Sequence, residues 1–558
     1  MTGASLKRFI HKINIFIFVL LLNGNVSAAK PGDSLTIGIT QYPSTFNPVI
    51  DAMMAKTYIL AMTRRPLTAY DQDWKLVCML CVTLPTIENG LAKPERTKNG
   101  KRGIAVTFQI KPEARWGDGV PVTSKDVVFS WKVGRNKKSG VGNAEFYRSL
   151  YKINVIDDKT FTLHFDKLTF TYNSLGGFEL LPEHIEAVNF SDPLKYRYKT
   201  AYDTDTFNEG LYNGPYVIAN RQTGSTVVLE KNPNWWGRKP YFKTITVRVI
   251  GNTSAMEANL LSGGIDMIAG ELGLPLDQAL SFEKRHGRKF NVIFKPGLIY
   301  EHIDLNLDNP FLKDIRVRRA LIYAMNRDAI NSQLFDGRQP KANSSVNPLD
   351  RVYADDVPVY DYNPAKAIKL LKQAGWKKTR KGIRYNDKGE KLSFTIMTTS
   401  GNRSRELIEQ VLQSQWRAVG IDIRIKNEPA RVFFGQTVTK RLFTGMAMYA
   451  WISSPESVPR TTLHSAHIPD KFNNYSGQNY TGYKNPEMNR VLEKIEVELD
   501  FRKRKNLWRK LQFMYARDLP VIPLYFRANA YILPGWLKNV KPTGQQDPTT
   551  LWVEDWKR

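Results

Sequence analysis

The chain has 558 residues, a length that corresponds to about three or four domain-sized units. Hydrophobic residues make up 42% and charged residues 24%, the composition of an ordinary globular protein that can bury large cores. The formal net charge is +28, but the basic residues are spread over the whole chain and no nucleic-acid-binding motif accompanies them. We therefore expect a basic, solvated surface and no nucleic-acid partner.

The first 28 residues have the pattern of a secretory signal peptide. Three basic residues within 7–12 precede a short apolar core at 13–22, and small residues at 26–28 fit a cleavage site. The apolar core is too short for a membrane span, no cysteine near the cleavage site offers a lipid anchor, and no later segment approaches membrane-spanning length. We predict that the signal peptide, 1–28, is removed and that the protein is periplasmic.

Elements in the first half of the chain follow from local patterns. A strand is expected at 34–40, a helix at 51–62 and an exposed polar loop at 86–103, before a strand at 104–110. Thr123 and Asp126 resemble a helix cap, with an acid three residues after the N-cap. Further strands are expected at 152–156 and 160–165, which form a hairpin, and at 216–219, 226–230 and 245–250.

The two cysteines of the chain, Cys78 and Cys81, lie three positions apart. A redox motif would need a thioredoxin-like context, which is absent, and a structural zinc site would need four ligands. We expect either a local disulfide or two buried thiols.

The second half mixes helices and strands. Gly375 and Gly420 are suited to end the helices that precede them. The expected helices are 315–326, 364–374, 403–419, 486–499 and 502–516, and the expected strands are 392–397, 421–425 and 521–526. No internal repeat stands out, so the pattern indicates an α/β (mixed α+β) protein.

A series of motifs spans the chain from about residue 34 onward. They are FQIKPEARWGDG at 108–119 with PVT at 121–123 and DVVFSW at 126–131, NGPY at 213–216, NPNWW at 232–236, ANLLSGGID at 258–266, DIRVRRA at 314–320 with AMNR at 324–327, and LPVIPLY at 519–525. In residue type and order they resemble the bacterial extracellular solute-binding proteins of family 5, which include dipeptide- and oligopeptide-binding proteins. Turn formation and helix packing explain most of these residues without a ligand, so we interpret them as scaffold.

The resemblance implies the large periplasmic-binding-protein fold, with two lobes and an extra third domain. The expected division is 29–63, 195–275 and 525–558 for lobe I, 64–194 for the extra domain attached to it, and 276–524 for lobe II. It also implies the substrate-binding component of an ABC importer, which holds a peptide-like solute between its lobes and delivers it to an inner-membrane permease. No enzymatic activity, cofactor or metal is expected, and we expect a monomer.

The resemblance places one segment, 449–455, in the cleft. In peptide-binding relatives the matching segment is commonly W-x-x-D, whose Asp pairs with the α-ammonium of the ligand. Here that position is Ser454, which offers a hydroxyl and no opposite charge. Either Glu456 supplies the charge instead, or the ligand is blocked, modified or not a peptide.

Eight residues are candidate ligand contacts. Trp451 offers a large amphipathic surface, although a core position explains it equally well. Arg460 could receive a carboxylate through its guanidinium fork, with a structural ion pair as the alternative. The others are Ser453, Ser454, Asn473, Tyr475, Tyr300 and Phe46.

Two other classes of protein remain as alternatives. A secreted hydrolase is one, although the chain contains no H-E-x-x-H or G-x-S-x-G motif. A periplasmic chaperone or envelope-binding protein is the other, and the basic charge permits it. Within the importer class, a nickel complex, haem or an oligosaccharide is an alternative ligand, since one scaffold can serve several solutes.

Overall fold

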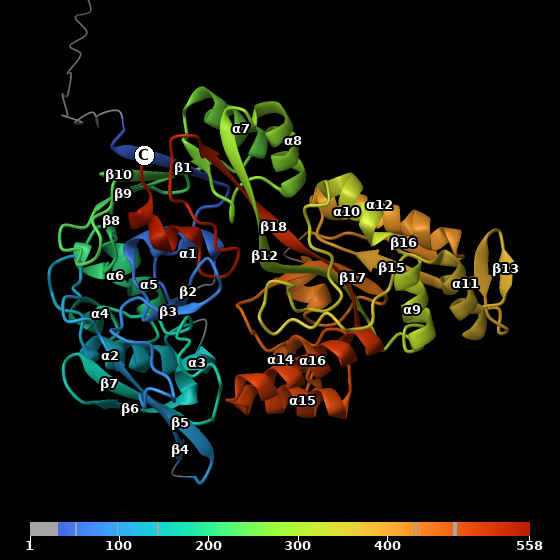
Figure 1. The fold of residues 1–558 in the computed structure, drawn as a ribbon, viewed down its shortest axis with the longest axis horizontal. Helices are drawn as coiled ribbons and strands as arrows, with labels where there is room; N and C mark the ends of the chain where they lie inside the picture. Colours follow the sequence, from blue (N-terminus) through green and yellow to red (C-terminus); the bar gives the residue numbers. More distant parts are fainter. Residues whose placement is uncertain (1–31, 51–52, 98, 142–143, 430–431, 473–476) are drawn as a thin grey trace, which may run out of the picture.

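The computed structural model describes residues 32–50, 53–97, 99–141, 144–429, 432–472 and 477–558. The predicted signal peptide lies outside these residues. The described chain forms two lobes that lie side by side (Figure 1). None of its helices combines the length and the apolar character needed to cross a bilayer.

One mixed sheet of ten strands runs through both lobes. In spatial order its strands are β16 (Asp422–Ile425), β15 (Ser393–Met397), β17 (Met446–Ile452), β12 (Phe290–Leu305), β18 (Val521–Pro534), β11 (Met267–Ile268), β1 (Ser34–Ile39), β10 (Thr244–Val249), β9 (Thr226–Lys231) and β8 (Tyr216–Gln222). Lobe II contributes the strands at one end and lobe I those at the other, so the two central strands, β12 and β18, belong to both (Figure 1).

These two strands form a connection between the lobes. The first half of β12 pairs antiparallel with 528–534, on the lobe I side, and its second half pairs with 521–526 and with β17 in lobe II. The register of the pair shifts between Pro296 and Tyr300, where the strands pass from one lobe to the other. At this point an added Cβ on Gly297 would lie 2.6 Å from the carbonyl oxygen of Gly544, so only glycine allows the close approach.

Lobe I contains a core that continues into the extra domain, because one hydrophobic cluster includes residues of both. Its helices are α1 (Met54–Thr63), α7 (Thr253–Ser262) and α8 (Leu276–His286), with short 3₁₀ turns at Glu209–Leu211 and Thr549–Asp555. The expected lobe boundary at 276 falls at the start of α8. Ala279 and Phe282 of this helix pack with Ala530 on the lobe I side, whereas Leu280 belongs to the lobe II cluster. Side chains of α8 therefore pack against the cores on both sides of the expected boundary.

The extra domain is built on an antiparallel sheet with the order β4 (Ala92–Arg96), β5 (Arg102–Gln109), β7 (Thr160–Phe165) and β6 (Leu150–Val155). Its other elements are the hairpin of β2 (Thr68–Tyr70) and β3 (Leu76–Cys78) and the helices α2 (Ser124–Arg135), α3 (Ala144–Ser149) and α4 (Glu183–Asn189). The short helices α5 (Tyr196–Lys199) and α6 (Ala201–Thr204) follow in the lobe I segment that begins at 195. The capping box of Thr123 and Asp126 is confirmed at the start of α2. The expected loop at 86–103 is wrong in part, because it contains β4, a polar edge strand in which Pro94 is tolerated.

Cys78 and Cys81 form a disulfide at the end of β3, which decides between the two expected states.

Lobe II surrounds its end of the sheet with helices. They are α9 (Ile315–Tyr323), α10 (Arg327–Phe335), α11 (Pro364–Gln373), α12 (Arg403–Ala418), α14 (Arg460–Leu463), α15 (Pro486–Val497) and α16 (Phe501–Asp518), with a π-helical segment at Phe433–Val438, a 3₁₀ turn at Ser465–His467 and the hairpin of β13 (Lys378–Arg380) and β14 (Ile383–Tyr385). Gly375 and Gly420 follow α11 and α12 with φ of 95° and 93°, so the predicted helix ends are confirmed.

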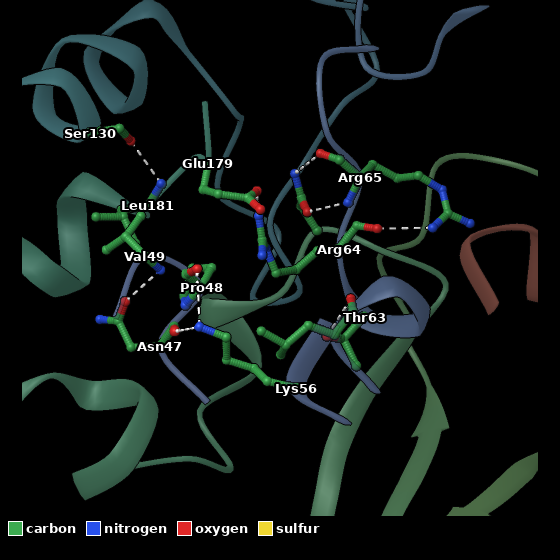
Figure 2. A network of polar contacts seen from close by, with 12 residues as sticks. Asn47, Pro48, Val49, Lys56, Thr63, Arg64, Arg65, Ser130, Glu179 and Leu181 are labelled. Carbon is green, nitrogen blue, oxygen red and sulfur yellow. Dashed lines mark hydrogen bonds and ion pairs between the residues drawn. The ribbon is translucent and has the colours of Figure 1, made fainter. Parts of the chain in front are cut away.

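Buried polar contacts join lobe I to the extra domain at residues 64 and 65. Figure 2 shows the guanidinium of Arg64, the first residue of the extra domain, paired with Glu179 of the same domain. The backbone N–H of Arg65 donates to Asn213 Oδ1 at 2.9 Å, and the Asn213 side chain donates back to the carbonyl of Arg65 at 3.3 Å. Gly214 packs so closely that an added Cβ would lie 2.4 Å from the nitrogen of Arg64. This part of the NGPY motif therefore has a structural role.

Candidate ligand-binding cleft

A cavity of about 600 Å³ lies between the extra domain and lobe II, and we call it the main cavity. The extra domain supplies one wall, which includes Tyr70, Phe146, Arg148, Phe165 and Thr171. Lobe II supplies the other wall, formed by 454–458 and Glu496. The extra domain attached to lobe I and lobe II thus both line one partly open space, as expected for a cleft that binds a ligand.

Direct contacts bridge the two walls. The ammonium of Lys167 pairs with the carboxylate of Glu496, and the backbone N–H of Phe170 donates to the carbonyl of Glu496 at 3.1 Å. The guanidinium of Arg504 lies 4.3 Å from the centre of the Phe170 ring, a cation–π contact. Glu496 and Arg504 are therefore the points at which lobe II holds the extra domain.

The C-terminal part of lobe I also reaches across to lobe II. The backbone N–H of Leu298 donates to the carbonyl of Gly544 at 2.8 Å. The hydroxyl of Ser454 donates to Gln546 Oε1 at 3.1 Å. Ser454 therefore lines the main cavity while it takes part in a contact between the lobes.

Glu456 is already neutralised within lobe II. Its side chain is buried, and its carboxylate is paired with the guanidinium groups of Arg351 and Arg504. Its backbone N–H donates to Asp350 Oδ2 at 2.8 Å. Burial, together with the charge of Glu456, raises the pKa of Asp350 to about 6. With two arginines bound, Glu456 has no free charge to offer a ligand ammonium, and the hypothesis that it replaces the missing Asp finds no support in this geometry.

A second pocket of about 260 Å³ opens in lobe II, and we call it the side pocket. Ser457 and Val458 line both the side pocket and the main cavity, so the two spaces adjoin. Strand geometry builds the back wall. Tyr300, His302 and Asp304 alternate along β12 and share one face, since successive side chains of a strand point to opposite faces.

The adjoining strand and helix complete this wall. On β17, Tyr449 lies opposite His302 and Trp451 lies opposite Tyr300. The Trp451 ring stacks on Tyr480 with ring centres 6.1 Å apart, so one of its faces is held by protein. Tyr515 of α16 closes the end of the pocket, and its hydroxyl lies 2.8 Å from that of Tyr300.

Four of the predicted site residues line these spaces, and two do not. Trp451, Ser453 and Tyr300 line the side pocket, and Ser454 lines the main cavity. Arg460 pairs with Glu496 at 3.1 Å, which is the structural alternative considered for it. Phe46 is 1% exposed in the core of lobe I and is not part of either space. Asn473 and Tyr475 lie outside the described residues.

Sequence reasoning missed His302, Asp304 and Tyr515. The signal for the first two is the alternation of Tyr300, His302 and Asp304, which places polar groups at every second position of the segment. Because no strand was expected at 290–305, that alternation had no structural meaning in the sequence.

Comparisons with known proteins agree with this architecture. The sequence profile of the family described as bacterial extracellular solute-binding proteins, family 5 Middle, matches residues 86–470. The oligopeptide-binding protein AppA of Bacillus subtilis is 27% identical over 530 residues, which cover 93% of this chain and 91% of AppA. The structure of AppA in complex with a nonapeptide has a TM-score of 0.72 at 26% identity and covers 94% of this chain and 98% of that one.

Two further solved structures are similar. The oligopeptide-binding protein of Thermus thermophilus, complexed with a pentapeptide, has a TM-score of 0.74 at 27% identity and covers 94% of this chain and 96% of that one. NikZ of Campylobacter jejuni in complex with Ni(L-His) has a TM-score of 0.75 at 22% identity, covers 95% of this chain and all (100%) of that one, and shares the fold.

The expected fold, two lobes of mixed α and β structure, is confirmed by these neighbours. Members of the matching family are binding proteins and not enzymes, so the hydrolase alternative is set aside. The profile match covers more than half of the chain, and the relatives extend along nearly all of it. The chain belongs to the bacterial extracellular solute-binding proteins of family 5.

Proposed function

We propose that the chain is the substrate-binding component of an ABC importer, which captures a peptide in the main cavity and delivers it to a permease in the inner membrane. The observation that carries this proposal is a partly open space of about 600 Å³ whose walls come from lobe II and from the extra domain attached to lobe I. The peptides named for the Bacillus and Thermus relatives support a ligand of the same class.

The hinge supplies the motion that such a function needs. β12 and β18 cross between the lobes at the register shift near 297–299, and small changes of backbone angle there would open the cleft. Opening would separate Lys167 from Glu496 and Phe170 from Arg504. A ligand that contacts both walls binds only the closed form well, and it therefore shifts the population toward that form, which the permease would recognise.

The division into lobes is part of the proposal. We retain 29–63 and 525–558 in lobe I and 64–194 as the extra domain, but we extend the middle segment of lobe I from 195–275 to 195–296, so that lobe II starts at the hinge near 297 instead of at 276. The reason is that Ala279, Phe282 and Phe290 pack on the lobe I side of the central sheet.

Export to the periplasm completes the proposal, with cleavage of the signal peptide after Ala28 and a monomer as the working form. The disulfide between Cys78 and Cys81 is consistent with an oxidising compartment.

The test is mass spectrometry of small molecules released from protein that is purified natively from its own host. We expect peptides, and each identified peptide should raise the melting temperature when it is added back to the emptied protein. Ni–histidine, haem and an oligosaccharide serve as competing ligands in the same thermal assay. Stabilisation by one of these and by no peptide would overturn the peptide assignment, and strong salt-dependent binding of unfolded chains would favour the chaperone alternative.

A further inference from the structure

The side pocket has the size and position to receive one side chain of a ligand held in the main cavity. Its volume, about 260 Å³, lies below the range typical of sites that enclose a whole drug-sized ligand. Ser457 and Val458 form the border that it shares with the main cavity. The chemistry of its polar end therefore bears on which ligands the protein accepts.

Two buried acceptors face each other at that end. His302 is 1% exposed and Asp304 is 4% exposed, and both line the side pocket. His302 Nδ1 lies 3.1 Å from the carbonyl oxygen of Tyr300, and because a carbonyl only accepts, Nδ1 carries the proton. His302 Nε2 makes no hydrogen bond and lies 3.4 Å from Asp304 Oδ1. A protonated His302 would itself balance the charge of Asp304. In the neutral imidazole, Nε2 and the carboxylate oxygen both present lone pairs, and one donor that reaches both atoms would satisfy them.

Asp304 has no positive partner among the described lysines and arginines, none of which forms an ion pair with it. Its other oxygen, Oδ2, accepts the hydroxyl proton of Tyr449, a neutral group. Glu301, on the opposite face of the same strand, is held by Arg405 and Arg527. While His302 is neutral, the buried carboxylate of Asp304 has no counterion among these groups, which is costly, and a ligand cation would remove that cost.

The remaining walls suit the stem of a long basic side chain. Apolar or aromatic side chains form part of these walls, namely Val346, Trp451, Val458, Leu463, Tyr515 and Val521, and they alternate with the polar side chains of Ser345, Ser453, Ser457, Thr461, Thr462 and Gln478. Lysine and arginine bury their methylene stems along apolar surface while their charged ends seek polar partners. The Trp451 ring adds a favourable surface for a nearby cation.

We propose that the side pocket binds a positively charged group of the peptide ligand, an ammonium or guanidinium, between Asp304 and His302. This inference rests on the proposed function, since it names the class of peptide that the cleft selects. The cation is either a lysine or arginine side chain or the α-ammonium of the peptide, and the two sources share one chemistry.

The test uses alanine pentapeptides in which a single lysine is moved through the five positions. Each is paired with a norleucine peptide, which has a similar stem and no charge, and each lysine peptide is also made with an acetylated N-terminus. Isothermal titration calorimetry gives Kd for each. If a side chain supplies the cation, one lysine position binds about 10- to 100-fold more tightly than its norleucine partner, the range for a hydrogen bond to a charged group. If the α-ammonium supplies it, acetylation weakens binding by a similar factor at every position.

The matched variants are Asp304→Asn, which keeps the shape and removes the charge, and Asp387→Asn, which makes the same change of net charge at a side chain 73% exposed on the far hairpin of lobe II. In Asp304→Asn, the ratio of Kd values between the uncharged peptide and its charged partner should fall close to one. In Asp387→Asn, this ratio should stay as it is in the unmodified protein. Circular dichroism checks that both variants are folded. The comparison of peptides on the unmodified protein needs no variant.

Peptides that bind without any dependence on lysine or on acetylation would refute the side-pocket inference and leave the proposed function intact. A charge preference that persists in Asp304→Asn would refute it as well, because another group must then hold the cation. Absence of binding by every peptide, with a folded protein, would overturn the proposed function and this inference together.

Discussion

The hinge contains a buried charge cluster whose loss should be easy to measure. Glu301 is 0% exposed, and its carboxylate accepts from Arg405 Nε at 2.6 Å and from Arg527 Nε at 2.7 Å. Burial alone would raise the pKa of this carboxyl, but the charges of Arg527 and Arg405 outweigh burial and hold the pKa at about 2. Glu301 thereby ties β12 to β18 and to α12, next to the point where the strands cross between the lobes.

We expect Glu301→Gln to lower the free energy of unfolding of this region by about 3 kcal/mol. Lowering the pKa from 4.5 to about 2 corresponds to about 3 kcal/mol of folding stability. Removing one member of a buried ion pair, which here leaves two arginines without a counterion, costs about 3–5 kcal/mol in other proteins. Because the folded-state pKa lies below the unfolded one, this contribution is present in full above about pH 4.5 and is lost as the pH falls toward 2.

The assay is urea unfolding at pH 7 and again at pH 3, monitored by tryptophan fluorescence. The control is Glu257→Gln, which breaks an ion pair with Arg285 at the surface of lobe I and should have a much smaller effect. The difference between wild type and Glu301→Gln should shrink at pH 3. A Glu301→Gln protein as stable as wild type at pH 7, or a loss of equal size for both variants, would refute the reasoning.

Three other outcomes follow from the contacts described. Glu496→Gln removes the charge partner of Lys167 across the cleft and should raise the Kd for peptide, measured by calorimetry, about two- to fivefold. High salt should reduce this difference. An unchanged Kd would show that the contact does not favour closure. Burial raises the pKa of Asp350 to about 6, so the free energy of unfolding of wild type should fall relative to that of Asp350→Asn as the pH rises from about 4 to 6. An equal pH dependence of the unfolding free energy in both proteins would contradict this. Replacing both Cys78 and Cys81 by serine should cost about 2 kcal/mol by urea unfolding, as expected for a disulfide that closes so short a loop, and no cost would mean that the bond does not constrain the unfolded chain.

Local signals predicted local structure well. The capping box of Thr123 and Asp126 and the glycines at 375 and 420 depend on residues close in sequence, so the helices they bound could be placed from the chain alone. The extent of the hinge strands, β12 and β18, could not be predicted in this way. The alternation in β12 is interrupted by Pro296 and Gly297, and its two halves pack against different lobes, so no single buried face runs along it. β18 was expected to end at 526 for the same reason, although it continues to Pro534.

The polar residues of the candidate site, His302 and Asp304, were not predicted because strand β12, which carries them, was not predicted. The resemblance at 449–455 predicted that Trp451 and Ser453 lie in the cleft, and in the structure both line the side pocket. Their role in binding stays a prediction. His302 and Asp304 come from β12, about 150 positions earlier in the chain, and only the antiparallel pairing of β12 with β17 brings the two segments together.

The distribution of charge around the cleft is the part that motif comparison could not supply. A motif identifies position 454 as the place where relatives carry an acid, and it shows that this chain has Ser454 instead. It does not show that the nearby acid, Glu456, forms ion pairs with Arg351 and Arg504, because those partners lie on other segments of the chain. With position 454 uncharged and Glu456 neutralised, Asp304 is the acid beside Trp451 that no arginine or lysine of the described chain pairs with. A cationic ligand group would therefore be held by strand β12 and not by the loop after β17, so substitutions at 454 should affect binding of a charged peptide less than substitutions at 304.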